Sequence, residues 1–196
     1  TWVRSIIASL MWTNDGIFNF DLLDKIKQFP TKNHFSSFTN DFGNIHEIKK
    51  HWETAQNIIN IDGKIKFLKT HHINCKIGQY NFTNKKNTLA TIYITRDPRN
   101  LVNSISNHYS LSLEESKEFL FTPNYIAGFK KHGGLKKDSL KTLLGTWSEH
   151  YKFWKNNNKN FLLIRYEDLI QDTSFELNKI IAFIKKFTKV QTNEVK

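Results

Sequence analysis

The segment that most restricts the fold of this chain is residues 89–95, LATIYIT, which is apolar or β-branched at nearly every position. A run of this kind is typical of a strand that is buried on both faces of a parallel sheet. It ends abruptly at Arg96, and Asp97 followed by Pro98 predicts a helix that begins at once, capped by the aspartate. A buried strand that passes directly into a helix is the basic unit of an α/β fold.

The rest of the chain repeats this alternation. A second buried strand is predicted at 161–166, FLLIRY, and a shorter strand-like run opens 65–72, IKFLKTHH. Apolar residues recur at helical spacing between the strands, and Ser112 with Glu115 and Thr173 with Glu176 mark two helix starts as caps. These signals predict helices over 2–12, 45–59, 98–109, 112–121, 140–156 and 173–184. We therefore predict an α/β fold with a mostly parallel central sheet flanked by helices and right-handed crossovers.

Size and composition indicate one folded domain. The 196 residues suffice for a single hydrophobic core, and 39% hydrophobic with 14% aromatic residues favours a globular chain. The lone Cys75 excludes a disulfide framework and fits a reducing compartment. No apolar stretch is long enough to span a membrane, and residues 6–12 lack the flanks of a signal peptide. We expect residues 1–196 to be one cytoplasmic domain.

The net charge of +11 points to several kinds of anionic partner. Nucleic acid, an anionic membrane or a phosphorylated ligand would each be attracted to such a chain. The basic residues are spread along it in short pairs, without a long basic tail, and compositional drift explains such a pattern equally well. The net charge therefore does not identify the partner. We expect no nucleic-acid ligand.

Three polar clusters follow predicted strands, and parallel strands end at a common edge where ligands bind. The clusters are Lys69-Thr70-His71-His72, Arg96-Asp97-Pro98-Arg99 and Tyr166-Glu167-Asp168. One polar strand end is routine, but three at one edge predict a ligand site.

The Arg96 cluster has the features of an anion site. A guanidinium beside the free N–H groups of a helix start binds phosphate or sulfate well. Ser104 lies on the same side of the predicted helix, two turns further on. The alternative is a structural ion pair between Arg96 and either Asp97 or Glu167, and the sequence leaves both interpretations open.

Lys69 and His71 lie two residues apart at a strand end and so point to the same side. A neighbouring ammonium helps to keep the imidazole neutral and available as a general base, and it can also neutralise a leaving oxygen. The alternative is an ordinary solvated strand end. Metal binding by His71 and His72 is disfavoured, because adjacent strand side chains diverge and no third ligand is evident.

Taken together, five segments resemble the P-loop sulfotransferases, enzymes that use 3′-phosphoadenosine 5′-phosphosulfate (PAPS). The segments are TWVRSII (1–7), FLKTHH (67–72), IYITRDPRNLVNSISNHY (92–109), GTWSEHYKFW (145–154) and LLIRYEDLIQD (162–172). They occur in the family's order over residues 1 to about 186. The most specific element is R-D-P-R-[DN]-x-x-x-S.

The resemblance implies a P-loop nucleotide-binding fold of three layers, α/β/α. It also implies transfer of a sulfuryl group from PAPS to a hydroxyl, or less readily an amine, of a small molecule or saccharide. By this resemblance His71 is the base that takes the acceptor's proton, and Lys69 contacts the oxygen that bridges phosphorus and sulfur. The sulfuryl group carries less charge than a phosphoryl dianion, so we expect no metal.

The same resemblance assigns the nucleotide contacts. Thr1 binds the 5′-phosphosulfate and Trp2 lies against the adenine. Arg96 and Ser104 hold the 3′-phosphate, and Tyr166 lies near the base.

Three features of the family are missing from these residues. The first strand and the lysine-bearing start of the phosphosulfate loop would precede Thr1, and an R-K-G-x-x-G segment would follow later than any residue present. The proline that often follows K-T-H is also absent. We therefore expect this chain alone to be weakly active or inactive. The alternatives are a non-catalytic nucleotide- or polyanion-binding domain and a P-loop kinase relative, the latter disfavoured because G-x-x-x-x-G-K-[ST] is absent.

Overall fold

The computed structural model describes residues 2–13, 15–127 and 140–188. Helices alternate with strands, and the central strands pair in parallel, so the predicted α/β class is confirmed. The α-helices are α1 (Trp2–Trp12), α2 (Ile45–Ile48), α3 (Trp52–Ile59), α4 (Pro98–Tyr109), α5 (Leu113–Phe121), α6 (Trp147–Asn157), α7 (Tyr166–Gln171) and α8 (Thr173–Lys185). The strands are β1 (Lys27–Gln28), β2 (Leu68–Lys69), β3 (Lys76–Ile77), β4 (Tyr80–Asn81), β5 (Thr91–Thr95), β6 (Ile126–Ala127), β7 (Thr142–Leu143) and β8 (Phe161–Arg165). Short 3₁₀ helices cover η1 (Phe20–Lys25), η2 (Lys32–His34) and η3 (Lys49–His51).

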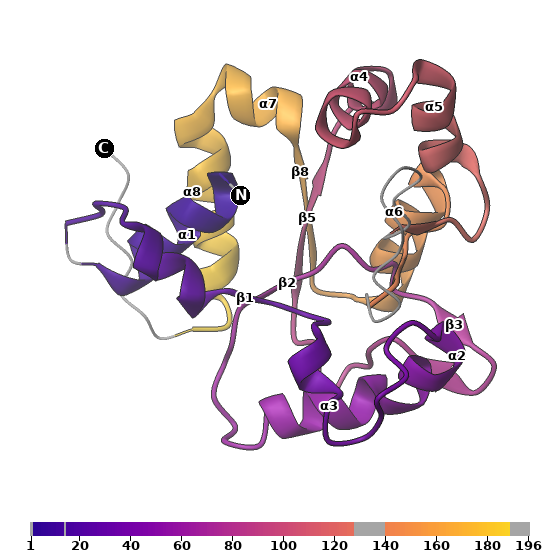
Figure 1. Ribbon diagram of the computed structural model, residues 1–196. Coiled ribbons are helices and arrows are strands. Elements are labelled where there is room, and N and C mark those ends of the chain that lie inside the picture. The colour runs from indigo at the N-terminus through magenta and orange to yellow at the C-terminus, as the bar shows by residue number, and fades with distance from the viewer. Residues whose placement is uncertain (1, 14, 128–139, 189–196) are drawn as a thin grey trace.

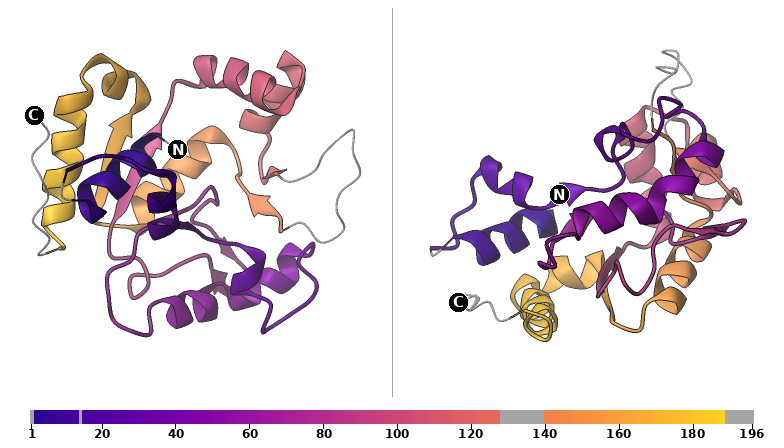
Figure 2. Two further views of the ribbon diagram at one scale, coloured as in Figure 1. Left: turned by 60° about the vertical axis from the view of Figure 1, so that its left-hand side comes forward. Right: turned by 90° about the horizontal axis from the view of Figure 1, so that it is seen from below.

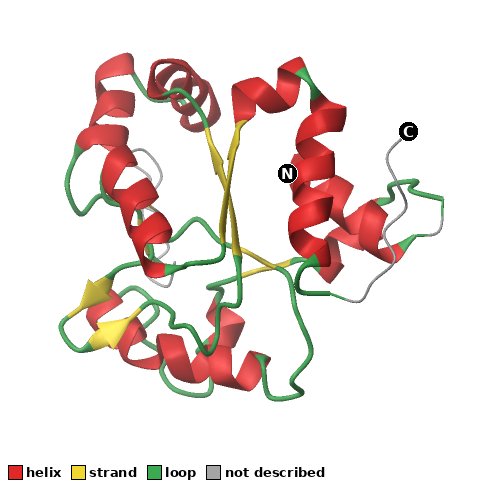
Figure 3. Cartoon of the chain, turned by 180° about the vertical axis from the view of Figure 1, so that it is seen from behind, coloured by secondary structure: helices red, strands yellow, loops and turns green. Residues whose placement is uncertain are grey.

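The centre of the molecule is the parallel pair β5–β8. It runs in register from Thr91 opposite Phe161 to Thr95 opposite Arg165. Helices α1, α7 and α8 lie on one side of this pair, and α4, α5 and α6 lie on the other (Figure 1). The view from behind shows the same arrangement, with the two strands between two groups of helices (Figure 3). The strands are therefore flanked by helices on both sides, as the sequence predicts.

The other strands are short. Strands β1 and β2 pair in parallel, whereas β3–β4 and β6–β7 are antiparallel, and the described strands make four separate two-stranded ladders. The strand-like run at 65–72 is reduced to Leu68–Lys69. The prediction that 89–95 is buried on both faces is wrong at Ile94, which is 45% exposed. Among the described strands β5 pairs only with β8, so it is an edge strand.

Two clusters of buried side chains stabilise these layers. The first joins the N-terminal helix to the C-terminal one, which lie far apart in the sequence (Figure 2), and it contains Val3, Ile7, Ala8, Leu22, Ile26, Ile164, Leu169, Leu177, Ile180 and Ile184. The second contains Phe29, Phe35, Ile48, Trp52, Ala55, Ile73, Cys75, Phe82, Leu143 and Trp154. Burial of one such large apolar side chain stabilises the fold by about 1.5–3 kcal/mol.

Helix α6 begins later than its apolar pattern predicts. The prediction places its start at Leu140, but Leu143 belongs to β7 and the helix starts at Trp147. Gly145 turns the chain with a φ of 64°, and Thr146 then forms a capping box with Glu149. The sequence Thr-x-x-Glu is a helix-start signal, and it outweighs the apolar residues upstream. Helix α8 is likewise capped one residue earlier than predicted, by the side chain of Asp172.

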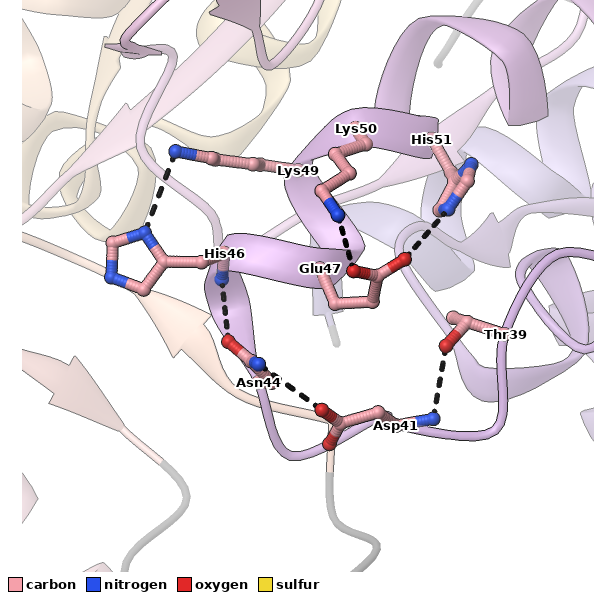
Figure 4. Close-up of polar contacts among 8 residues, drawn as sticks. All are labelled: Thr39, Asp41, Asn44, His46, Glu47, Lys49, Lys50 and His51. Carbon is pink, nitrogen blue, oxygen red and sulfur yellow. Dashed lines mark hydrogen bonds and ion pairs between the residues drawn. The ribbon is translucent and has the colours of Figure 1, made fainter.

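The helix predicted over 45–59 is divided into α2, η3 and α3. A network of polar side chains holds its beginning (Figure 4). Asn44 accepts a hydrogen bond from the main-chain N–H of His46, and Glu47 pairs with Lys50 and His51. These contacts fix the turn that places Ile48 in the second cluster.

Candidate functional site

Two of the predicted clusters meet at the carboxyl end of the β5–β8 pair. Thr95 is opposite Arg165, so the next residues along each strand, Arg96 and Tyr166, are neighbours. The guanidinium carbon of Arg96 lies 4.8 Å from the centre of the Tyr166 ring. A planar cation over an aromatic face is held in place while its N–H groups stay available to a ligand. The structure therefore brings these two predicted site residues together.

The carboxylates near Arg96 are engaged elsewhere. Asp97 caps α4 through the N–H of Arg99 and pairs with the Arg99 guanidinium, whose hydrogen bonds hold the pKa of Asp97 down at about 2. Glu167 accepts a hydrogen bond of 2.8 Å from the main-chain N–H of Asp97. The alternative prediction, an ion pair from Arg96 to Asp97 or Glu167, is therefore wrong. Within the described part of the chain, the guanidinium of Arg96 has no carboxylate or hydrogen-bond partner.

The remaining predicted nucleotide contacts are more dispersed. Ser104 is partly buried in α4, and its hydroxyl makes no hydrogen bond to any residue that the structure describes. Trp2 is the first residue of α1 and is 44% exposed. Thr1 lies outside the described residues.

Lys69 and His71 lie at the end of β2. Burial and the nearby charge of Arg4 lower the pKa of Lys69. The side chain of His71 reaches the surface, yet partial desolvation and the Lys69 ammonium lower its pKa, so the neutral imidazole predominates at pH 7. A neutral, accessible imidazole beside an ammonium is the state that a general base requires.

His72 has a different environment. Its ring is fully buried, stacks on Phe82 at 4.2 Å between centroids, and meets Trp52 edge-on. Its Nδ1 bonds the carbonyl of Ile73, while its Nε2 is buried without a partner. The neighbouring histidines thus point in opposite directions, and His72 is part of the core.

Burial lowers the pKa of His72 to about 4. In the unfolded chain a histidine has a pKa near 6.5, so protons bind first to the unfolded state. We expect this group to make the free energy of unfolding fall by about 3 kcal/mol as the pH drops from about 6.5 to about 4. Urea unfolding at a series of pH values measures this slope.

The matched variant is His72→Gln, which should flatten the dependence on pH. Titration of the His72 ring by NMR in the unchanged protein is a second measurement. A ring that titrates near 6.5 in the folded state would contradict this assignment of His72 to the core.

Helix α6 supplies contacts that the sequence does not single out. The indole N–H of Trp147 donates to the main-chain carbonyl of Arg96, and the ring of His150 bonds the carbonyl of His71. One helix therefore touches both halves of the site. Trp147 belongs to the apolar face of the predicted helix, His150 does not, and only their spacing of three residues hints that they act together.

The described residues contain no group of three or more His, Cys, Asp or Glu side chains that could hold a metal ion. They also contain no helix that is long and apolar enough to cross a membrane.

Comparison with known proteins gives consistent matches. Residues 2–195 match the model of the sulfotransferase domain family. Sulfotransferase 2A1 of Rattus norvegicus is 31% identical over 109 residues, which cover 53% of this chain and 34% of that protein. The 3-beta-hydroxysteroid sulfotransferase of Cavia porcellus is 28% identical over 125 residues, covering 61% and 39% respectively. The chain thus spans about a third to two fifths of the length of these relatives.

Among solved structures, mouse sulfotransferase SULT7A1 complexed with PAP is similar with a TM-score of 0.45 and 22% identity. The match covers 71% of this chain and 46% of the mouse protein.

Proposed function

The chain belongs to the sulfotransferase domain family, and from this premise we propose that it moves a sulfuryl group from PAPS to the hydroxyl of a small molecule. One observation carries the proposal furthest. The guanidinium of Arg96 is held over Tyr166 at the carboxyl end of the central strands, with no acidic partner among the described residues. A free, oriented guanidinium at this position fits a phosphate.

The nucleotide is held at this corner. Arg96 and the free hydroxyl of Ser104 bind the 3′-phosphate, and the aromatic rings of Tyr166 and Trp2 contact the adenine. Thr1 binds the 5′-phosphosulfate. Each residue has the chemistry its role requires, because phosphate oxygens accept hydrogen bonds and the base offers an aromatic face.

Lys69 and His71 serve the transfer itself. PAPS supplies the sulfuryl group, whose bond to the bridging oxygen breaks as a bond from sulfur to the acceptor oxygen forms. His71 takes the proton that leaves the acceptor hydroxyl, and the lowered pKa of the imidazole keeps it free to do so. Lys69 places its ammonium near the departing bridging oxygen and stabilises the charge that develops there.

The acceptor is a small alcohol or a saccharide. Two of the similar proteins are named for hydroxysteroids, which places steroid alcohols among the first acceptors to assay. An amine is the less favoured acceptor.

Radiolabelled PAPS tests this proposal with a panel of steroid alcohols, simple alcohols, saccharides and amines. The assay uses a protein that also carries the phosphosulfate loop expected before Thr1. We expect label in a sulfate ester of at least one hydroxyl acceptor. Tight binding of the nucleotide without any ester or sulfamate product would instead support the non-catalytic alternative.

A further inference from the structure

One face of helix α6 carries four side-chain N–H donors, and each bonds a main-chain carbonyl of the candidate site or of the segment beside it. The donors are spaced by three, four and three residues, so they lie in one row along the helix. The pairs are Trp147 Nε1 with the carbonyl of Arg96 at 3.2 Å, His150 Nε2 with that of His71 at 3.2 Å, Trp154 Nε1 with that of His72 at 3.0 Å, and Asn157 Nδ2 with that of Asn74 at 2.9 Å.

These carbonyls belong to main chain that has left the strands. Arg96 follows β5 directly, and residues 71–74 lie between β2 and β3. Main-chain groups in such segments lack ladder partners, and leaving them unpaired away from water is costly. This cost applies to the carbonyls of Arg96, His72 and Asn74, whose contacts are buried or partly buried, whereas the contact to His71 is exposed. Helix α6 supplies the partners for both segments, which are otherwise distant in the sequence. The relative position of Arg96 and His71 therefore depends on this one rigid element.

His150 is held in a single tautomer. A carbonyl can only accept, so the Nε2 of His150 carries the proton that it shares with His71. Its Nδ1 is then an acceptor, and the hydroxyl of Tyr93 lies 2.9 Å away as the donor. Burial lowers the pKa of His150 and raises the pKa of Tyr93, so both groups stay neutral around pH 7. Strand β5 thus fixes the ring that holds His71.

The first turn of α6 is also fixed where Trp147 begins it. The capping box of Thr146 and Glu149 closes the helix start. A Cβ on Gly145 would lie 3.0 Å from the Cδ1 of Ile73, so the start of the helix passes very close to the segment that contains His71. Trp154 and the neighbouring core anchor the far end, since Trp154 is only 6% exposed.

We propose that α6 is the positioning element of this site: Trp147 holds the nucleotide-binding corner and His150 holds the segment of the base. The two residues are three positions apart, about 4.5 Å along the helix axis, so the helix sets the separation between bound nucleotide and base. The role in transfer rests on the function proposed above. Neither side chain reacts; both act through main-chain carbonyls.

Two variants separate the two contacts. Trp147→Phe removes the indole donor but keeps an aromatic ring, and we expect it to weaken binding of 3′,5′-bisphosphoadenosine by roughly two- to tenfold, the effect of one hydrogen bond. His150→Phe should leave this affinity unchanged and release the segment of His71, so that the His71 ring becomes better solvated and part of the desolvation that lowers its pKa is lost. The pKa of His71 should therefore rise. Calorimetry gives the first quantity, and NMR titration of the His71 ring gives the second.

Trp52→Phe is the matched control, because Trp52 is a buried indole whose N–H has no partner. It should reduce stability through lost volume while leaving both quantities unchanged. In the active protein we also expect His150→Phe to lower kcat, because the base is then less well positioned. His150→Gln restores an N–H donor, so it should recover much of this loss with KM little changed.

Two results would overturn the inference. In the first, Trp147→Phe and His150→Phe each change both the nucleotide affinity and the pKa of His71, in proportion to the stability lost. In the second, neither variant changes either quantity more than Trp52→Phe does. Failure of the proposed function gives a different result. In that case the unchanged protein binds no bisphosphate nucleotide, and the titration of His71 in His150→Phe still decides whether α6 positions that segment.

Discussion

Replacing His71 with alanine is expected to lower the rate of sulfuryl transfer by ~10²–10⁴-fold, the usual contribution of a general base. The physical reason is the state of its ring. Partial desolvation and the nearby Lys69 ammonium lower the pKa of His71, so the neutral form that accepts a proton predominates at pH 7. Nucleotide affinity should stay near that of the unchanged protein, because the imidazole acts on the acceptor. Initial rates with PAPS, in a protein that carries the loop expected before Thr1, measure the loss.

His46 offers a matched control for this variant. It is an exposed histidine that lies 3.4 Å from the ammonium of Lys49, so it resembles His71 in having a lysine neighbour (Figure 4). His46→Ala should leave the rate unchanged. A loss with His71→Ala no larger than with His46→Ala would exclude His71 as the base. His72→Ala does not serve as a control, because removing a fully buried ring that stacks on Phe82 damages the core.

Replacing Arg96 with alanine is expected to weaken binding of 3′,5′-bisphosphoadenosine by about 1.5–3 kcal/mol, the range for a hydrogen bond to a charged group. Because each 1.4 kcal/mol is tenfold, this corresponds to roughly 10- to 150-fold in Kd. Adenosine 5′-monophosphate lacks the 3′-phosphate, so its affinity should hardly change. Calorimetric titration of both nucleotides into the 196-residue chain measures the difference.

Arg99→Ala is the control at the same corner. The Arg99 side chain is 89% exposed and its guanidinium is paired with Asp97. Since exposed ion pairs contribute little, this variant should change the affinity by roughly twofold or less. If Arg96→Ala weakens both nucleotides equally, Arg96 does not bind the 3′-phosphate.

Much of the central fold follows from local sequence signals. The strands at 91–95 and 161–165 and the helix that Asp97 caps are predicted correctly, because β-branched apolar runs and an Asp-Pro helix start are strong local preferences. The start of α6 is not predicted from its apolar pattern. Leu140 and Leu143 pack in the second cluster before the helix begins, and Leu143 belongs to β7. The spacing of apolar residues indicates which residues are buried, but not whether they belong to a helix or to a strand.

The site could be predicted in part. Alternation along the chain correctly separates His71 from His72, since neighbouring side chains point in opposite directions. It does not reveal that His72 stacks on Phe82, nor that Asp97 and Glu167 have other partners and leave Arg96 free. These facts depend on which groups meet in space.

The contacts of α6 are the clearest case of what sequence cannot give. Trp147 and the carbonyl of Arg96 are 51 positions apart, and His150 and the carbonyl of His71 are 79 apart. Main-chain carbonyls occur at every residue and leave no mark in the sequence. A tryptophan that donates its N–H to one therefore looks the same as a tryptophan that only fills space.

The central claim is that the corner formed by Arg96 and Tyr166 binds a nucleotide through its 3′-phosphate. Calorimetric titration of the unchanged chain with 3′,5′-bisphosphoadenosine and with adenosine 5′-monophosphate, at the same salt concentration, tests this claim most directly. We expect the bisphosphate to bind at least about tenfold more tightly, since one charge-assisted contact to the 3′-phosphate contributes about 1.5 kcal/mol or more. Equal affinities for the two nucleotides, or binding of neither, would contradict it.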